Sequence, residues 1–261
     1  MPFPAFRKFR LIDSWDPFSL FQSWRSNGPG VLLESARLSP RTGRYSLVAK
    51  DPFLILEAKG NRVALREGRS TRVFRGDPFK LTAALLKKHA HPARPGFPPF
   101  TGGAVGVVGY EAKNVIEPGL FRKLPDDVGL PDVYLLFFNE TIVVDHEAGV
   151  LFLFGKKLGR LEKILEETAR FAGGRRGEDA PVRPASEVKR TFSRKAFIES
   201  VKKAKAYIRR GEIFQANLSQ RFSFSVHENA SDLYPRLRRI NPSPFFGILD
   251  AGSFQILSGS P

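Results

Sequence analysis

The sequence predicts a fold in which α-helices and β-strands are mixed along the chain. Hydrophobic residues make up 42% of its 261 residues, enough for a sizeable core and too many for general disorder. Short apolar stretches bounded by glycine, proline and asparagine are typical of strands, whereas apolar residues three and four positions apart indicate helices. Both patterns recur in this chain, so we expect helices and strands together.

In the first half of the chain, two predicted helices begin where an aspartate precedes a proline. Asp16-Pro17 and Asp77-Pro78 each place a capping carboxylate before a proline at the first helical position. The second of these helices is expected to extend to about His89. Strands are predicted at residues 31–35, 45–49, 53–58 and 62–66.

The second half contains the best candidate for a domain boundary. Residues 173–189 are rich in glycine, proline and arginine and are predicted to form a linker or exposed loop. We therefore expect one domain at 1–172 and a second at 190–261. The second has too few residues to form an independent hydrophobic core and is expected to be incomplete. The predicted elements are strands at 133–138, 141–145 and 151–154, helices at 158–168, 194–210 and 231–240, a long strand at 213–226, and a hairpin at 245–258.

Composition excludes several classes of protein. The chain has no cysteine, which excludes disulfide scaffolds, thiolate metal sites and cysteine nucleophiles. Its four histidines lack the spacing of a metal site. No run approaches the roughly 18 apolar residues that a membrane span needs, and the N-terminal residues lack the pattern of a signal peptide. The sequence thus predicts a soluble, cytoplasmic protein.

The formal net charge of +16 is concentrated in one region. Residues 156–210 hold 17 Lys and Arg against 7 Asp and Glu, many of them on the helix predicted at 194–210. Such a surface can bind nucleic acid, but this one lacks interleaved aromatic side chains and any known binding motif. A solvated helix face is the favoured interpretation.

The predicted strand at 213–226 has two different faces. Alternation places apolar side chains, among them Phe214 and Phe222, on one face. A polar row on the other face suits the wall of an anion-binding cavity, although a solvated sheet face is commoner. In a cavity wall, the guanidinium of this row should be buried and bonded to a carboxylate or to backbone carbonyls. The polar row consists of Gln215, Asn217, Ser219 and Arg221.

The glycine-rich segment 101–110 does not match a nucleotide-binding loop. Its glycines recur at every third residue from Gly103, and no Gly-Lys-Ser or Gly-Lys-Thr follows them. Glycine within a strand usually allows another backbone to approach closely, and we favour that role here.

Several segments, taken in order, resemble component I of the chorismate-utilising synthases, namely anthranilate synthase and aminodeoxychorismate synthase. The block from Gly211 to Phe222 and the Asn241-Pro242-Ser243-Pro244-Phe245 turn are the most specific matches. The other matching segments are Leu32–Ser35, Gly43–Ser46, Pro99–Gly106, Gly109-Tyr110, Leu130–Asp132, Asp145-His146 and Ser260-Pro261.

The resemblance implies an α+β fold in which β-sheets pack face to face with helices outside them. It also implies a reaction that replaces a hydroxyl of chorismate with ammonia, using Mg²⁺ and a separate glutamine amidotransferase subunit. The family's magnesium-binding and chorismate-binding residues belong to a C-terminal half without counterpart in this sequence. The chain is thus expected to be an N-terminal fragment that ends within the family's Ser-Pro-Glu motif and is inactive alone, and no catalytic residue or metal ligand is assigned to it.

The resemblance further implies a tryptophan pocket, a feedback site in anthranilate synthases. The sequence reads Pro-Phe-Phe where anthranilate synthases commonly have Pro-Tyr-Met. The segment from Gly43 to Phe53 and the Asn241–Phe245 turn resemble the aminodeoxychorismate branch, which belongs to folate biosynthesis, more closely than the anthranilate branch. Anthranilate synthase, a tryptophan-binding module without catalysis and one half of a split enzyme remain alternatives. The positions that match the pocket are Glu34, Ser35, Thr42, Gly43, Arg44, Tyr45, Pro244, Phe245 and Phe246.

Overall fold

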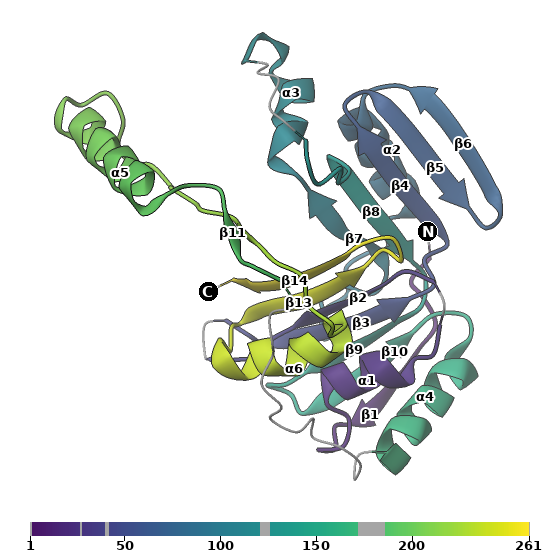
Figure 1. The fold of residues 1–261 in the computed structure, drawn as a ribbon. Coiled ribbons are helices and arrows are strands. Elements are labelled where there is room, and N and C mark those ends of the chain that lie inside the picture. Colours follow the sequence, from purple (N-terminus) through teal and green to yellow (C-terminus); the bar gives the residue numbers. More distant parts are fainter. Residues whose placement is uncertain (1, 27, 40–41, 121–125, 172–185, 261) are drawn as a thin grey trace. The chain divides into compact units, whose positions relative to one another are not determined.

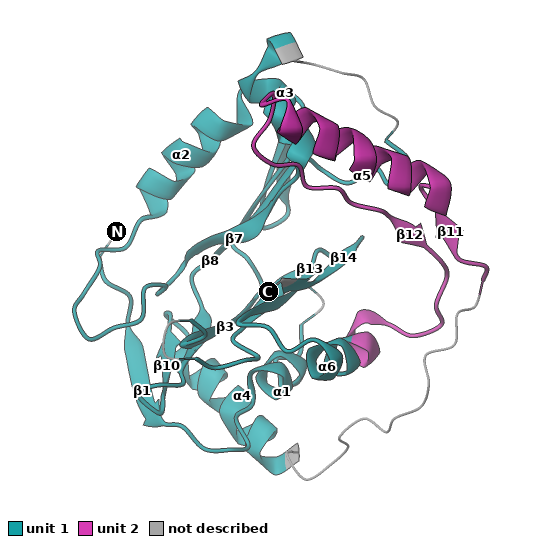
Figure 2. Ribbon diagram, turned by 90° about the vertical axis from the view of Figure 1, so that its left-hand side faces the viewer, with its two compact units in different colours: residues 1–176, 234–261 teal, residues 177–233 magenta. Residues whose placement is uncertain are grey.

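The computed structural model describes residues 2–26, 28–39, 42–120, 126–171 and 186–260. The chain divides into two compact units, one formed by residues 1–176 and 234–261 and the other by residues 177–233 (Figure 2). Most of the linker predicted at 173–189 lies outside the described residues. Residues 234–261, which the sequence pattern groups with 190–233, belong to the first unit because their hairpin pairs with an N-terminal strand.

A seven-stranded antiparallel sheet forms the centre of the first unit. The C-terminal hairpin adds to this sheet beside an N-terminal strand, with Phe246 opposite Glu34 and Asp250 opposite Gly30. The predicted strands at 31–35, 45–49, 141–145 and 151–154 and the hairpin at 245–258 are confirmed within one or two residues. In spatial order the strands are β1 (Phe6–Arg10), β10 (Val150–Phe154), β9 (Thr141–Asp145), β3 (Tyr45–Lys50), β2 (Gly30–Glu34), β13 (Phe245–Asp250) and β14 (Gln255–Ser260).

A second antiparallel sheet of the first unit has five strands. Gly106 shows why the glycine-rich segment belongs here, because a Cβ at this position would lie 2.0 Å from the backbone oxygen of Tyr134 on the neighbouring strand. The close backbone approach predicted for the segment is thus confirmed. In order, the strands are β6 (Ser70–Arg75), β5 (Arg62–Glu67), β4 (Leu54–Lys59), β8 (Val133–Phe138) and β7 (Gly103–Val108).

Helices cover the outer face of each sheet. Asp16 and Asp77 cap α1 (Pro17–Ser23) and α2 (Pro78–His89) through backbone N–H groups of the first turn, as predicted. Figure 1 shows α1, α4 (Leu158–Phe171) and α6 (Ala230–Ile240) along one face of the seven-stranded sheet, and α2 packs on the five-stranded sheet. The short helices η1 (Tyr110–Ala112), α3 (Lys113–Ile116) and η2 (Pro118–Leu120) follow β7.

The inner faces of the two sheets pack against each other. Val31 and Ala49 of the seven-stranded sheet share one buried cluster with Ile55, Tyr134 and Leu136 of the five-stranded sheet. The unit therefore has the α+β architecture that the resemblance implies, with face-to-face sheets between layers of helices. Among the described residues, no helix is both long and apolar enough to cross a bilayer.

The second unit contains α5 (Arg194–Arg209) and a two-stranded ribbon of β11 (Lys189–Arg190) and β12 (Phe222–Ser223). The helix confirms the prediction at 194–210, and none of its residues is buried.

The prediction of a long strand at 213–226 is wrong, because only the two residues of β12 are paired. Alternation describes the two faces of a strand, but a strand also needs a neighbour for its backbone groups. In the described part of this unit, β11 supplies that neighbour over only two residues. Gln215, Asn217, Ser219 and Arg221 are exposed, so the expected burial of Arg221 is also wrong.

Candidate ligand-binding site

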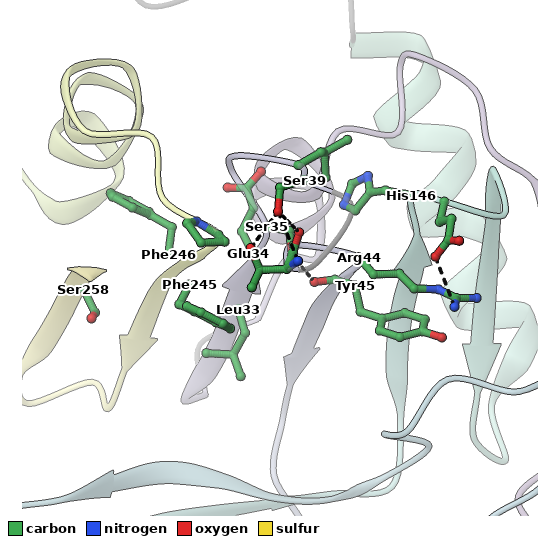
Figure 3. A pocket seen from close by; sticks show the side chains of 16 residues that line it. Leu33, Glu34, Ser35, Ser39, Arg44, Tyr45, His146, Phe245, Phe246 and Ser258 are labelled. Carbon is green, nitrogen blue, oxygen red and sulfur yellow. Dashed lines mark hydrogen bonds and ion pairs between the residues drawn. The ribbon is translucent and has the colours of Figure 1, made fainter. Parts of the chain in front are cut away.

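A cavity of about 1150 Å³ opens at one end of the seven-stranded sheet, where β2 and β9 end and β3 and β13 begin (Figure 3). Its volume is slightly above the range of roughly 300–1,000 Å³ that is typical of small-molecule sites. Its lining combines aromatic, hydroxyl and charged groups. The lining residues are Leu33, Glu34, Ser35, Leu38, Ser39, Thr42, Gly43, Arg44, Tyr45, His146, Glu147, Pro244, Phe245, Phe246, Gly247 and Ser258.

All nine positions that the resemblance assigns to a tryptophan pocket line this one cavity. Glu34 and Pro244 are far apart in the sequence and meet because β13 pairs with β2. The turn before β13 is also tied to the loop after β2, since the Arg37 N–H donates to the Ser243 carbonyl oxygen at 3.2 Å. The sheet thus assembles the cavity, whereas the identity of its ligand stays a prediction.

Only glycine fits at position 43, in the loop that leads into β3. Gly43 has φ +83°, and a Cβ at this position would lie 2.4 Å from the Arg37 carbonyl oxygen. Residues 40–41 of the same loop lie outside the described residues, while Ser39 and Thr42 on either side hydrogen-bond to each other. The glycine lets the loop turn back so that Arg44 and Tyr45 reach the cavity.

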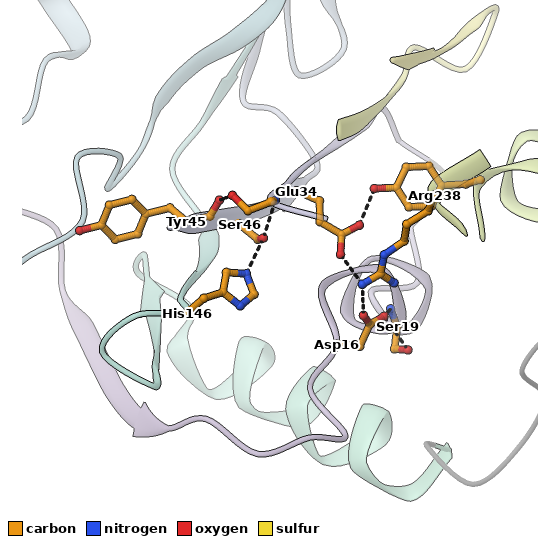
Figure 4. Close-up of polar contacts among 9 residues, drawn as sticks. Asp16, Ser19, Glu34, Tyr45, Ser46, His146 and Arg238 are labelled. Carbon is orange, nitrogen blue, oxygen red and sulfur yellow. Dashed lines mark hydrogen bonds and ion pairs between the residues drawn. The ribbon is translucent and has the colours of Figure 1, made fainter. Parts of the chain in front are cut away.

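Glu34 lines the cavity, and two groups from α6 hold its buried carboxylate (Figure 4). Tyr234 donates its hydroxyl to Glu34 at 2.6 Å, and the Arg238 guanidinium pairs with Glu34 at 2.7 Å. Asp16, the cap of α1, binds the same guanidinium at 2.8 Å. One arginine therefore joins β2, α6 and α1.

Burial and hydrogen bonding shift the pKa of Glu34 in opposite directions. Burial is the largest effect and raises the pKa of the Glu34 carboxyl, while Arg238 and the Tyr234 hydroxyl oppose it by stabilising the charged form. Burial likewise raises the pKa of the Tyr234 hydroxyl, as does the adjacent Glu34 charge, so Tyr234 remains a hydrogen-bond donor. The Glu34 carboxylate is thus already bonded to two groups of the protein.

Tyr234 is fully buried, and its ring also makes apolar contacts between α6 and the sheet. Its ring stacks on Phe18 of α1 at a centroid distance of 4.8 Å and meets the edge of Phe246 at 5.0 Å. Phe246 therefore packs its ring into the helix-covered core. Phe245, the next residue in the strand, points to the opposite face and is 61% exposed.

A chain of hydrogen bonds links Ser35 to His146. The Ser35 hydroxyl donates to the Tyr45 carbonyl oxygen at 2.7 Å, and its backbone N–H donates to the Ser46 hydroxyl oxygen at 3.1 Å. The Ser46 hydroxyl is in turn 2.8 Å from His146 Nε2. Burial lowers the pKa of His146, so its ring is neutral at pH 7. It faces the cavity as a neutral polar group.

Arg44 is held by two carboxylates. It donates Nε and Nη2 to the two oxygens of Asp145 at 2.9 and 2.8 Å, and its Nη1 is 3.2 Å from Glu147. Burial alone would raise the pKa of Asp145, but the hydrogen bonds from Arg44 and the Ala148 N–H outweigh it and lower that pKa. The guanidinium lies over the Tyr45 ring, 4.9 Å from its centroid.

Sequence reasoning missed the residues behind the cavity wall. Tyr234 and Arg238 are one helical turn apart on α6, a spacing that places them on the same helix face. That spacing is the only signal that could have pointed to them, and it does not name Glu34 or Asp16 as partners. The polar row at 215–221 belongs to the other unit and does not line this cavity. Over the described residues, no three His, Asp or Glu side chains gather to hold a metal ion.

Comparison with known proteins assigns the chain to a family. The family model for chorismate binding enzymes matches residues 35–261, which is most of the chain. The chain belongs to the chorismate-binding enzyme family. It is 32% identical to anthranilate synthase component 1 of Acetivibrio thermocellus over 95% of this chain and 54% of that protein. It is also 32% identical to aminodeoxychorismate synthase component 1 of Bacillus subtilis, over 88% of this chain and 50% of that protein.

A solved structure agrees with these sequence matches. Anthranilate synthase component I from Streptococcus pneumoniae aligns with a TM-score of 0.65 and 27% identity, over 86% of this chain and 51% of that one. The chain thus has the fold of this family and spans about half the length of the curated relatives it matches. Curated relatives come from both the anthranilate and the aminodeoxychorismate branches.

The lowered pKa of Asp145 predicts how the stability of this site changes with pH. Because the native carboxyl binds a proton less readily than the unfolded one, its contribution is present at neutral pH and is lost as the pH falls through the native pKa. Replacing it (Asp145→Asn) should lower the unfolding free energy at pH 7 by about 1.5–3 kcal/mol, the scale of hydrogen bonds to a charged group.

Urea unfolding at pH 7 and at about pH 3, where carboxyl groups titrate, measures this effect. The difference between wild type and variant should shrink at the lower pH. The exposed Asp13 provides a control (Asp13→Asn) that should match the wild type at both pH values. A difference for Asp145→Asn that grows on acidification would contradict the assigned direction of the pKa shift.

Proposed function

We propose that this chain acts in the amination of chorismate, as part of a component I synthase. Family membership and the fold shared with anthranilate synthase component I support the proposal. In this reaction ammonia replaces a hydroxyl of chorismate, and a glutamine amidotransferase subunit would supply the ammonia. Mg²⁺ would assist loss of the hydroxyl, but the described residues provide no cluster that fits the ion, so we derive no step through it.

Between the two branches of the family we propose the aminodeoxychorismate branch. Its support is the resemblance of the segment from Gly43 to Phe53 and of the Asn241–Phe245 turn to that branch. Anthranilate synthase component I is the second candidate, supported by the Acetivibrio thermocellus relative at 32% identity. Preference for the C-terminal half of one relative or the other distinguishes the two.

We further propose that the cavity binds L-tryptophan. The observation that carries this proposal is the convergence of all nine predicted pocket positions on one cavity, although they come from segments some 200 residues apart. Tyr45 and the exposed Phe245 ring offer apolar surface for an indole, and hydroxyl and charged groups surround them.

Tryptophan binding can be measured on the chain itself by titration calorimetry. Replacing the exposed aromatic ring of the wall (Phe245→Ala) should weaken binding about tenfold, because roughly 1.4 kcal/mol of apolar contact is lost. Phe214, fully exposed in the other unit, provides a matched control (Phe214→Ala) that should bind like the wild type. Equal affinity for all three proteins would place the ligand elsewhere, and no heat of binding would refute the tryptophan site.

The amination proposal predicts that the 261-residue chain, incubated with chorismate, ammonium and Mg²⁺, forms no product alone. The resemblance assigns chorismate and magnesium binding to residues without counterpart in this sequence. Adding the C-terminal half of the Bacillus subtilis relative as a separate chain should restore formation of 4-amino-4-deoxychorismate, identified by mass, with that half alone as the control. Because the added half carries the catalytic residues, the branch is tested by which half restores more activity. Stronger restoration by the C-terminal half of the Acetivibrio thermocellus relative would refute the branch, and turnover by the chain alone would refute the assignment of catalysis to the C-terminal half.

A further inference from the structure

The described part of the second unit, residues 186–233, contributes nothing to the hydrophobic core of the protein. None of the four buried apolar clusters includes a residue of this range, and Ala230 is the only buried hydrophobic residue within it. Nine large hydrophobic side chains of the same range are exposed instead. So many exposed apolar side chains in so short a range indicate an interaction surface.

These side chains form rows on the helix and on the segment that follows it. On α5, Val201 and Ile208 are two helical turns apart and lie on the same side. The segment 213–224 returns from the end of α5 to β12 without a helix (Figure 2). In an extended chain its Phe214, Leu218 and Phe222 share one face, because they are separated by even numbers of residues.

The backbone of the segment 213–224 has a neighbour only near its end. The β11–β12 ribbon pairs two residues, and the Thr191 N–H donates to the Arg221 carbonyl oxygen at 3.1 Å beside it. The Gln220 side chain also donates to the Phe192 carbonyl oxygen, at 2.8 Å. Strand pairing among the described residues does not extend to 213–219, although the alternation typical of a strand does. An extended segment of this kind can join a sheet of another polypeptide.

The comparisons indicate what covers this surface. The family model matches residues 35–261, so the second unit lies within the family's own domain. This chain covers only 54% and 50% of two curated relatives, which are therefore about twice as long. A mainly apolar surface is covered by the core of a folded polypeptide, whereas nucleic acid is bound chiefly through cations that reach its phosphates.

We infer that the apolar rows of α5 and of the segment 213–224 are the docking surface for the polypeptide that forms the second half of the relatives. On docking, the segment 213–224 becomes a β-strand, because the added polypeptide supplies the neighbouring strand that its backbone lacks. This inference rests on the proposed function, in which the chain is the first half of a component I synthase.

Hydrogen exchange followed by mass spectrometry tests the change from an extended segment to a strand. The 261-residue chain should be compared alone, with the C-terminal half of the Bacillus subtilis relative, and as a fusion that joins this half after Pro261. The fusion gives a high effective concentration, so weak docking is detected as well. Amides of 213–219 should exchange at least about tenfold more slowly with the half than without it, and those of β4 and β5 should not change.

Two leucines of similar exposure provide a variant and its control. Leu218 is 43% exposed in the segment 213–224, and Leu86 is 45% exposed on α2 of the first unit. Leu218→Ser should weaken binding of the separate half at least about tenfold, measured by titration calorimetry, because an apolar contact is lost. Leu86→Ser should bind like the wild type. Both side chains are on the surface, so both variants should fold.

Each outcome has a defined meaning. Unchanged exchange at 213–219 in the fusion, or equal affinity of Leu218→Ser and wild type, overturns the inference. If the half nevertheless restores amination, the proposed function stands without this surface. Slower exchange at 213–219 without amination supports the inference and contradicts the proposed function.

The same measurement identifies other occupants of the surface. Slower exchange in the chain alone that increases with its concentration would assign the surface to a second copy of the chain. Slower exchange on adding duplex DNA, without an effect of the half, would assign it to nucleic acid. Either result overturns the inference.

Discussion

The buried ion pair between Glu34 and Arg238 is the contact on which the candidate site depends. It joins the end of β2 to α6, two segments about 200 residues apart, in a place where the Glu34 side chain is almost completely shielded from water. A buried carboxylate left without its partner is strongly destabilising, so α6 and the adjoining turn must stay docked on the sheet. Pro244 and Phe245, which precede and begin β13, are thereby positioned to line the cavity.

The same contact links the architecture to the chemistry of the cavity. Arg238 is divided between Glu34 and Asp16, and Arg44 is divided between Asp145 and Glu147. In each arrangement one guanidinium binds a buried carboxylate, Glu34 or Asp145, together with a second carboxylate that is more exposed. The ion pairs that hold the strand ends together therefore also fix the positions of charged side chains at the cavity.

Local sequence patterns predict most of the individual helices and strands, but not how distant strands pair to form the sheets. Alternation and Asp-Pro caps identify most strands and the starts of α1 and α2, because those signals lie within a few residues. They fail for 213–226, where the alternation is present but the described unit offers only two residues of strand pairing. The addition of β13 to β2 has no local signal, since strand pairing across the chain depends on contacts between distant segments. For the same reason the nine pocket positions follow from the resemblance, while Tyr234, Arg238 and Asp16 do not.

The central claim is that Glu34 and Arg238 act as a coupled pair that holds α6 on the sheet. A double-mutant cycle on the unfolding free energy, with Glu34→Gln, Arg238→Met and the double variant, tests it most directly. We predict that the two single losses sum to more than the loss of the double variant by about 1–3 kcal/mol, because each single variant strands the other group. Losses that add to within about 0.5 kcal/mol would show two independent groups and would contradict this account.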